Sequence, residues 1–241
     1  MLIILPVRNE SKIISQVVLN LTTFINQKIP GTKLVFIDDH STDGTLILLK
    51  EINSPDVEVI QNNFDCGKGS AIKTALLISR FMKEADEDDF VVLMDGDGQV
   101  LPENILQLTK HSDFYNADVV VGSKRHVYSN IRYSFCRRII SNVYNFITRA
   151  MFGFNLRDTQ CGIKIFRKRV LSDIISKVTV KEFAFDLECM VALYERGYLI
   201  VESPVRITAQ KNKGSVSFGT ILRTAFDTLC IWARKQKGYY K

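Results

Sequence analysis

Apolar residues in the first half of the chain gather into short runs, which longer amphipathic segments separate. The runs cover 2–7, 33–39, 57–61 and 90–95 and have the length and composition of strands. Helices are predicted between them, over 10–27, 43–52 and 69–85. The first helix repeats apolar residues with the helical period, at Ile13, Ile14, Val17, Val18, Leu21, Phe24 and Ile25. Because the strands are apolar on both faces, we expect a parallel sheet covered by helices on both sides.

The second half of the chain is more mixed. Further strands are predicted over 117–123, 161–166 and 199–205. Helices are predicted after Pro102 and over 132–152, 168–177, 186–196 and 218–236. We expect one α/β domain over 1–217, followed by a C-terminal amphipathic helix and basic tail over 218–241.

Polar clusters follow three of the predicted strands at the point where each strand ends. They are Arg8-Asn9-Glu10, Asp38-Asp39 and Asp95-Gly96-Asp97. In open parallel sheets, ligands bind beyond the carboxyl ends of the strands. We therefore place the candidate site at this edge.

Asp95 and Asp97 are the strongest candidates for metal ligands. Side chains alternate along a strand, so both carboxylates project to one side, and Gly96 leaves room for a ligand beside the backbone. Two carboxylates together with substrate phosphates suit Mg²⁺ or Mn²⁺. An EF-hand loop is excluded, because Val100 and Leu106 stand at the positions that require Gly and Glu.

Two other interpretations of this acidic pair remain open. It forms a solvated Asp-Gly turn, or it belongs to a phosphatase in which Asp95 is the nucleophile and Asp97 the acid. That phosphatase motif usually opens its domain, whereas here three strands precede it.

The stretch DCGKGSAIKTAL (65–76) resembles a nucleotide loop only superficially. Gly69 follows Lys68 where a P-loop needs Ser or Thr, and the third glycine of a dinucleotide fingerprint is missing. Two interpretations of this stretch are equally open. In the first, the loop at the start of a helix offers Lys68 to a phosphate; in the second, Gly69 and Ser70 only cap the helix.

The distribution of charge along the chain predicts an anionic ligand. The chain of 241 residues has 46% hydrophobic and 24% charged residues, which is typical of a folded globule. The net charge of +6 is concentrated between Lys124 and Arg169, where eleven basic residues face one acid, Asp158. Aromatic and aliphatic residues alternate with these cations, which favours a helix at a lipid interface over nucleic-acid binding. A solvated face and core packing are the plainer alternatives.

The compartment is indicated by features that the chain lacks. Five cysteines without paired spacing favour a reducing environment. The opening MLIILPV has no basic region before it and is interrupted by Pro6, so we interpret it as a strand and not as a signal peptide. No apolar run is long enough to span a bilayer.

Seven motifs in order resemble the inverting GT-A glycosyltransferases of the polyprenyl (dolichyl) phosphate sugar synthase type. They are ILPVRNE, FIDDHSTDGT, GKGSAIKTAL, MDGDGQVLPENI, GSKRH, RDTQCGIKIFRKRV and FAFDLECMVALYERGYLIVESPV. RDTQCG together with FAFDLE is closer to the dolichyl-phosphate glucosyltransferases than to the mannosyl enzymes. The resemblance implies a Rossmann-like, mostly parallel central sheet flanked by helices.

The resemblance assigns the donor site to the first half of the chain. It implies that Pro6, Val7, Asn9 and Glu10 line the base and ribose, that Asp39 reads the base and that Asp38 closes the pocket. It implies that Asp95 and Asp97 hold Mg²⁺ or Mn²⁺ on the donor diphosphate, with Gln99 beside them. Lys68, Lys124 and Arg125 join the donor-binding set, although Lys124 stands where the family often has Arg and lacks its bidentate fork.

The acceptor side follows from the same resemblance. Arg137 and Ser141, four residues apart on one helical face, match a pair that grips the lipid phosphate. Asp158, Thr159, Gln160, Asp186 and Glu188 would shape the sugar-acceptor cleft.

The expected reaction moves a hexose, from UDP-glucose by preference, to a polyprenyl or dolichyl phosphate with inversion to a β linkage. GDP-mannose and UDP-N-acetylglucosamine are the alternative donors, and a catalytically silent sugar-nucleotide or membrane-binding protein is a further class. We expect a peripheral enzyme on the cytoplasmic face of a membrane, without transmembrane helices and without a nucleic-acid partner.

Overall fold

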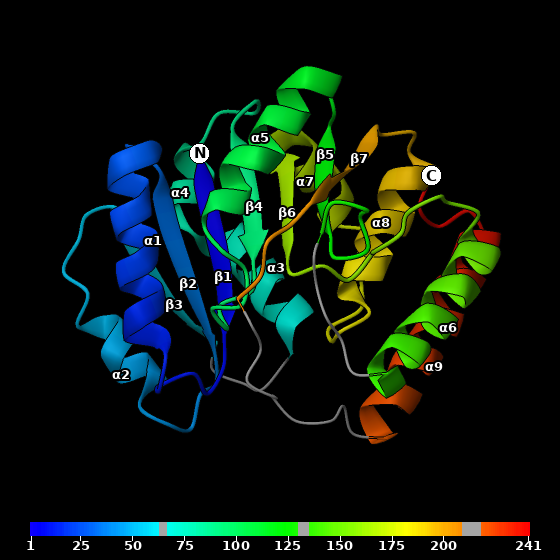
Figure 1. The fold of residues 1–241 in the computed structure, drawn as a ribbon, viewed down its shortest axis with the longest axis horizontal. Helices are drawn as coiled ribbons and strands as arrows, with labels where there is room; N and C mark the ends of the chain where they lie inside the picture. Colours follow the sequence, from blue (N-terminus) through cyan, green and yellow to red (C-terminus); the bar gives the residue numbers. More distant parts are fainter. Residues whose placement is uncertain (63–66, 130–134, 209–217) are drawn as a thin grey trace.

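A seven-stranded sheet forms the centre of the computed structural model (Figure 1). The structure describes residues 1–62, 67–129, 135–208 and 218–241, with residues 135–140 and 218 described by their backbone alone. The strands are β1 (Leu2–Val7), β2 (Lys33–Asp39), β3 (Val57–Asn62), β4 (Phe90–Met94), β5 (Val119–Ser123), β6 (Ile163–Arg167) and β7 (Ile200–Pro204).

The sheet has the order β3-β2-β1-β4-β6-β5-β7. All neighbouring strands pair in parallel except β6, which runs antiparallel to both β4 and β5. The prediction of a mostly parallel α/β sheet flanked by helices is therefore confirmed. The reversed strand β6 brings the loop that precedes it to the carboxyl end of β4, beside Asp95.

Nine helices lie in the part of the chain that the structure describes. They are α1 (Ile14–Lys28), α2 (Thr45–Lys50), α3 (Lys68–Ile78), α4 (Arg80–Glu84), α5 (Glu103–Tyr115), α6 (Phe135–Phe152), α7 (Lys168–Ile175), α8 (Phe185–Glu195) and α9 (Phe218–Gln236). The first half matches the predicted pattern closely. On α1, the residues buried against the sheet are Ile14, Val17, Leu21 and Ile25, at the spacing that the sequence predicted.

One predicted helix is wrong in its extent. The segment expected over 69–85 divides into α3 and α4 at Ser79, whose backbone is extended (φ −56°, ψ 131°). The Ser79 hydroxyl accepts the amide of Met82 and donates to the carboxylate of Glu58 on β3. Ser79 therefore starts a new helix as its N-cap, a contact that outweighs the continuous helical pattern.

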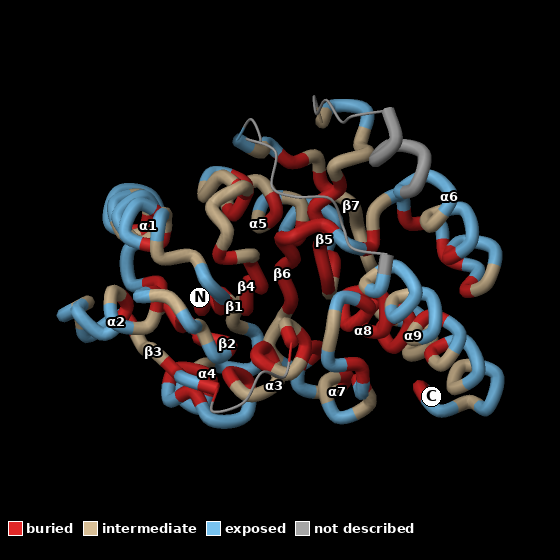
Figure 2. Tube along the Cα trace, turned by 90° about the horizontal axis from the view of Figure 1, so that it is seen from below, coloured by how far each residue is buried: buried red, intermediate tan, exposed pale blue. Residues whose placement is uncertain are grey.

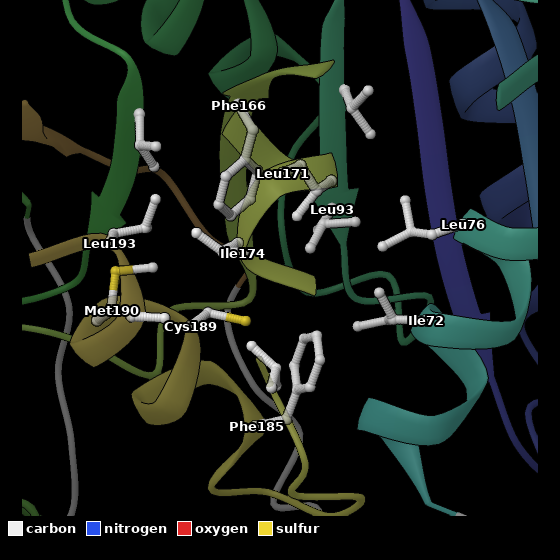
Figure 3. Close-up of a cluster of buried hydrophobic side chains, with 14 of the residues drawn as sticks. Ile72, Leu76, Leu93, Phe166, Leu171, Ile174, Phe185, Cys189, Met190 and Leu193 are labelled. Carbon is white, nitrogen blue, oxygen red and sulfur yellow. The ribbon is translucent and has the colours of Figure 1, made fainter. Parts of the chain in front are cut away.

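The two faces of the sheet are covered by different helices and hold different parts of the core. One face carries alternate residues such as Leu5 and Val92 and packs against α1 and α5. The other face carries residues such as Ile4 and Leu93 and packs against α3, α4, α7 and α8. Figure 3 shows the centre of this second layer, where Ile72, Phe166, Ile174, Phe185 and Met190 meet.

Helices α6 and α9 lie side by side at one end of the molecule, beyond α8 (Figure 2). The hydroxyl of Tyr144 on α6 lies 3.2 Å from that of Thr228 on α9. Ile231 and Tyr240 are completely buried in the same core layer as α8. The C-terminal segment thus packs directly on the body of the domain.

Candidate functional site

The carboxyl ends of β1, β2 and β4 meet at the lower edge of the sheet in Figure 1. Val7 pairs with Asp38 across the parallel β1–β2 ladder. The amide of Gly96, just beyond β4, donates to the carbonyl of Pro6 over 3.3 Å. The three polar clusters that the sequence singled out are therefore neighbours in space.

The loop after β1 is held against the loop after β2 by side-chain hydrogen bonds. Asn9 has a positive φ of 54°, and its side-chain oxygen accepts the amide of Thr42 over 2.8 Å. The amide of Asn9 donates to the Ser41 hydroxyl over 2.9 Å. The amide of Glu10 donates to the hydroxyl of Thr45 over 2.8 Å. Asn9 and Glu10 thus join the loop after β1 to the loop after β2, and the two together form a double loop.

Asp43 completes this double loop and was missed in the sequence. Its carboxylate accepts the amides of Ser11 and Thr45, each over 3.0 Å, and also the Thr45 hydroxyl. Burial alone would raise the pKa of Asp43, but the hydrogen bonds from Thr45 and Ser11 hold it well below its usual range. The signal was available in HSTDGT, a cluster of residues that favour turns and caps.

Asp38 and Asp39 present acceptor atoms at the end of β2. One Asp38 oxygen accepts the amide of Ser41 over 3.1 Å, whereas Oδ1 is buried with no hydrogen-bond partner in the part of the chain that the structure describes. Asp39 accepts the side-chain amide of Asn62 over 3.2 Å. A buried acceptor without a donor is costly, so Asp38 Oδ1 is well suited to an N–H group of a ligand.

Asp95 and Asp97 leave the sheet in a tight turn. The Asp95 amide donates to the carbonyl of Gly162 over 2.8 Å, and Asp97 Oδ1 accepts the amide of Gln99 over 3.0 Å. Gly96 packs so closely on β1 that a Cβ atom would lie 2.3 Å from Val7 Cγ1. The glycine between the two acids is thus required by the protein's own packing.

Asp95 stands at one end of a chain of ion pairs that runs through Lys68 and Asp186 to Lys164. Lys68 Nζ lies 2.8 Å from Asp95 Oδ1 and 2.9 Å from Asp186 Oδ2. Asp186 Oδ1 in turn lies 2.7 Å from Nζ of Lys164, a residue that is only 2% exposed. Burial opposes ionisation of Asp186, but the charges of Lys164 and Lys68 outweigh it and lower its pKa to about 2. Asp186 is therefore ionised near neutral pH.

Lys164 was not predicted as a site residue. The available signal was a lone lysine in the otherwise apolar stretch GIKIF. Lysine is rarely buried without a partner, and this stretch forms the buried strand β6. Its ammonium also donates to the carbonyl of Cys161 over 2.8 Å. Because both partners are fixed by the fold, Lys164 holds Asp186 in one orientation.

The donor set of Asp95 and Asp97 fits a hard divalent cation. Carboxylate oxygens are the ligands that Mg²⁺ and Mn²⁺ prefer. Within the described residues, no cluster of three or more His, Cys, Asp or Glu side chains is placed to hold a metal ion. A metal at this corner would therefore depend on water and substrate oxygens for its remaining ligands.

A second cluster lies between the end of β5 and α6. Asp158 accepts the amide of Lys124 over 3.0 Å and that of Gln160 over 3.2 Å. The Arg125 guanidinium donates to the Ser141 hydroxyl and, over 2.8 Å, to the side chain of Asn142. Arg125, which the sequence analysis assigned to the donor-binding set, therefore contacts Ser141, which it assigned to the acceptor side.

The loop 153–162 joins this second cluster to the acidic corner. Asp158, near the middle of the loop, contacts Lys124, and Gly162, the last residue of the loop, contacts Asp95. Glu202, which the sequence analysis missed, accepts the amides of Arg157 and Asp158 over 2.8 and 3.1 Å and supports the loop from β7. Thr159 is buried and Gln160 is exposed. Arg137 belongs to α6, but its side chain lies outside the described residues.

Glu188 is not brought together with the other candidates. It is completely buried and accepts the amides of Thr179 and Val180 over 2.7 and 2.6 Å. It also binds the guanidinium of Arg234 and accepts the hydroxyl of Tyr240 over 2.6 Å. The carboxylate anchors the C-terminal segment.

The outer face of the α6–α9 pair exposes large apolar side chains. They are Val143, Phe146 and Ile147 on α6, and Ile221, Leu222, Phe226, Leu229 and Trp232 on α9. Phe146 is 76% exposed and Phe226 66%. Among the described helices, none has both the length and the apolar character of a membrane span.

The seven-stranded sheet with its reversed strand β6, flanked by helices, has the GT-A fold. The chain belongs to glycosyl transferase family 2, whose model matches residues 2–175. This confirms the resemblance drawn from the seven motifs, and it removes the phosphatase alternative.

Two curated relatives are similar over almost the whole chain. A dolichyl-phosphate beta-glucosyltransferase of Drosophila melanogaster is 25% identical, over 99% of this chain and 76% of that protein. A polyprenol monophosphomannose synthase of Mycolicibacterium smegmatis is 26% identical, over 96% of this chain and 86% of that protein.

The solved structures show the same fold at low identity. Glucosyl-3-phosphoglycerate synthase of Mycobacterium tuberculosis, in complex with Mn²⁺, UDP and glucosyl-3-phosphoglycerate, superposes with a TM-score of 0.70 at 16% identity. That match covers 96% of this chain and 78% of the other. Mannosyl-3-phosphoglycerate synthase of Rubrobacter xylanophilus superposes with a TM-score of 0.70 at 17% identity. That match covers 98% of this chain and 74% of the other.

Proposed function

We propose that this glycosyltransferase moves a hexose from a nucleotide sugar, UDP-glucose by preference, to a polyprenyl or dolichyl phosphate. The observation that carries the proposal is the loop 153–162, which connects an acidic corner at Asp95 with a cationic cluster at Lys124 and Arg125. The first suits the diphosphate of a donor with its metal, and the second suits an anionic acceptor. The two relatives named for transfer to lipid phosphates support this acceptor class.

The donor half of the site uses the double loop and the acidic corner. Asp38 Oδ1 and Asp39 offer acceptors to the base, beside Pro6 and Val7 at the end of β1. Asp95 and Asp97 would hold Mg²⁺ or Mn²⁺, with Gln99 next to them. When bound, this metal supplies positive charge that stabilises the departing nucleoside diphosphate.

The acceptor half would bind a phosphate monoester through Arg125 and Ser141, with Lys124 and Arg137 adding positive charge. A guanidinium and a hydroxyl are suitable donors for phosphate oxygens. Because a lipid monophosphate is already anionic near neutral pH, its oxygen attacks the anomeric carbon without strong general-base help. The new C–O bond forms on the face opposite the breaking bond to the diphosphate, so an α-linked donor gives a β-linked product.

We further propose that the α6–α9 face rests on a membrane as a peripheral contact, on the side where nucleotide sugars are supplied. Apolar and aromatic side chains project outward there, and Arg149 and Arg223 lie on the same two helices. An amphipathic pair of this kind suits the headgroup region of a bilayer, where the polyprenyl chain of the acceptor is dissolved.

The test is transfer of radiolabelled sugar into an organic-phase product. The protein is incubated with Mn²⁺ or Mg²⁺, a polyprenyl phosphate, and UDP-glucose, UDP-N-acetylglucosamine or GDP-mannose in turn. We expect a labelled lipid that releases β-linked sugar phosphate, with UDP-glucose as the best donor. GDP-mannose as the best donor would favour the activity for which the mycobacterial relative is named. If no donor yields a lipid product although the protein binds UDP and Mn²⁺, the acceptor assignment is wrong.

A further inference from the structure

Asp95 already has a cation beside it in the protein itself. The ammonium of Lys68 lies 2.8 Å from Asp95 Oδ1, and the Lys68 side chain is 23% exposed. This oxygen belongs to the corner that suits a divalent metal. A metal bound through it would therefore have to share the oxygen with Lys68 or replace Lys68 there.

The backbone that carries Lys68 is fixed. The amides of Gly69 and Ser70 both donate to the carbonyl of Lys181, over 2.7 and 3.2 Å. A Cβ atom at Gly69 would lie 2.7 Å from Phe185 Cβ, so α3 begins in close contact with α8. Any exchange at Asp95 must therefore be a movement of the Lys68 side chain, whose four-carbon stem allows it.

Asp186 forms a second ion pair with Lys68, which Lys68 keeps when it leaves Asp95. Its Oδ2 lies 2.9 Å from Lys68 Nζ, and Lys164 holds its other oxygen at 2.7 Å. Lys164 and Asp186 are both buried, so neither leaves its partner without exposing an unpaired charge to the interior. Lys68 can give up Asp95 and still keep one charged partner.

We propose that Lys68 is the resting counter-cation of Asp95, which a divalent metal replaces, and that Asp186, held by Lys164, is the positioning residue that retains Lys68 nearby. This inference rests on the proposed function, because it needs a metal at Asp95 and a diphosphate donor beside it. The displaced ammonium is then available to the donor diphosphate. Metal and nucleotide consequently bind together far better than the metal binds alone.

The charges of the cluster account for this coupling. The formal charges of the four ion-paired side chains, Lys68, Lys164, Asp95 and Asp186, sum to zero. A divalent cation adds two positive charges, which Asp97 only partly balances, so the metal alone meets repulsion from Lys68. A diphosphate supplies the missing negative charge, and binding of each ligand raises the affinity for the other by the same factor.

The test measures binding of Mn²⁺ alone, from the electron paramagnetic resonance signal of the free ion, with and without UDP. Lys68→Met removes the competing ammonium, so we expect it to bind Mn²⁺ without UDP about tenfold more tightly than the wild type. The enhancement by UDP should largely disappear in this variant. Lys73→Met removes the same charge from the same helix, where the lysine contacts the carbonyl of Val178, and should behave like the wild type.

Asp186→Asn tests the anchor and should have the opposite effect. Lys68 then has Asp95 as its remaining charged partner in this cluster, so Mn²⁺ without UDP should bind more weakly than to the wild type. If this variant does not fold, Lys68→Gln serves as a second variant that lacks the ammonium. It should bind Mn²⁺ without UDP more tightly than the wild type, as Lys68→Met does. Equal Mn²⁺ affinity of wild type and both Lys68 variants, without UDP, overturns the proposal. Failure of the wild type to bind Mn²⁺ even with UDP instead overturns the proposed metal site.

Discussion

The carboxylates of Asp186 and Glu188 serve two different clusters although one residue separates them on α8. Asp186 binds Lys68 and Lys164 beside the acidic corner, whereas Glu188 binds Arg234 and Tyr240 of the C-terminal segment. The first turn of α8 therefore contacts both the charged cluster beside Asp95 and the C-terminal segment.

The Glu188 cluster is expected to support stability more than catalysis. Glu188→Gln removes a buried charge that satisfies two backbone amides and Arg234, so unfolding should become easier by about 3 kcal/mol or more. Tyr240→Phe removes one of several donors and should cost about 1.5 kcal/mol. Urea denaturation measures both, with the exposed Glu51→Gln as control. Wild-type stability in Glu188→Gln would contradict this role.

The Asp186 cluster is expected to make stability depend on acid. The lysines lower the Asp186 pKa from the ordinary 3.8 to about 2, so the folded state favours the ionised form. This contribution is complete above the unfolded pKa and is lost as the pH falls through the folded value. The stability difference between wild type and Asp186→Asn should shrink by roughly 2 kcal/mol from about pH 5 to about pH 2. Chemical denaturation across this range measures it, and a constant difference would rule out the coupling.

The acidic corner is expected to be essential for transfer. Asp97→Ala and Asp95→Asn should each lower the rate of lipid glycosylation by about 100-fold or more, because the leaving diphosphate loses its stabilising charge. The protein should still fold, since both side chains lie at the partly exposed end of β4. Asp56→Asn, at an exposed salt bridge with Lys33, serves as the control. Wild-type rates in either corner variant would dismiss the metal site.

Gly162 is expected to control the position of Asp95. A Cβ atom at Gly162 would lie 2.2 Å from Asp95 Oδ2, and the three nearest atoms all belong to that side chain. Gly162→Ala should therefore rotate the carboxylate, weaken Mn²⁺-dependent UDP binding about tenfold and cost less than about 2 kcal/mol in stability. Gly44→Ala is the matched control, because a Cβ atom there has nothing within 4 Å. Calorimetric titration with UDP and Mn²⁺ distinguishes the two variants.

The exposed face of α6 and α9 is expected to bind bilayers. Phe146→Ser combined with Phe226→Ser removes two of its most exposed aromatic side chains, so partitioning into vesicles with anionic lipids should fall about tenfold or more. Ile47→Ser changes an apolar side chain of similar exposure on α2 and should bind like the wild type. Vesicle co-sedimentation measures this. Equal binding of all three proteins would direct attention to another surface.

The strands of the first half were predictable because their pattern is local. β1, β2, β3 and β4 lie where apolar runs end in polar residues, and the stripe on α1 matches its buried face. The acidic pair was found for the same reason, since side-chain alternation and Gly96 are visible in a few residues. The division at Ser79 was missed because it depends on Glu58, which lies on a strand 21 residues earlier.

Local pattern in the sequence was sufficient for the strands, the family and the acidic corner, because each depends on neighbours along the chain. The charged network of Lys68, Lys164 and Asp186 was established by folding, since the two partners of Lys68 lie 27 and 118 residues away from it. The burial of Glu188 likewise depends on α9, which packs against α8 from the far end of the chain. The physical reason is that the energy of a buried charge depends on the partners that surround it in space, and sequence spacing alone does not specify those partners.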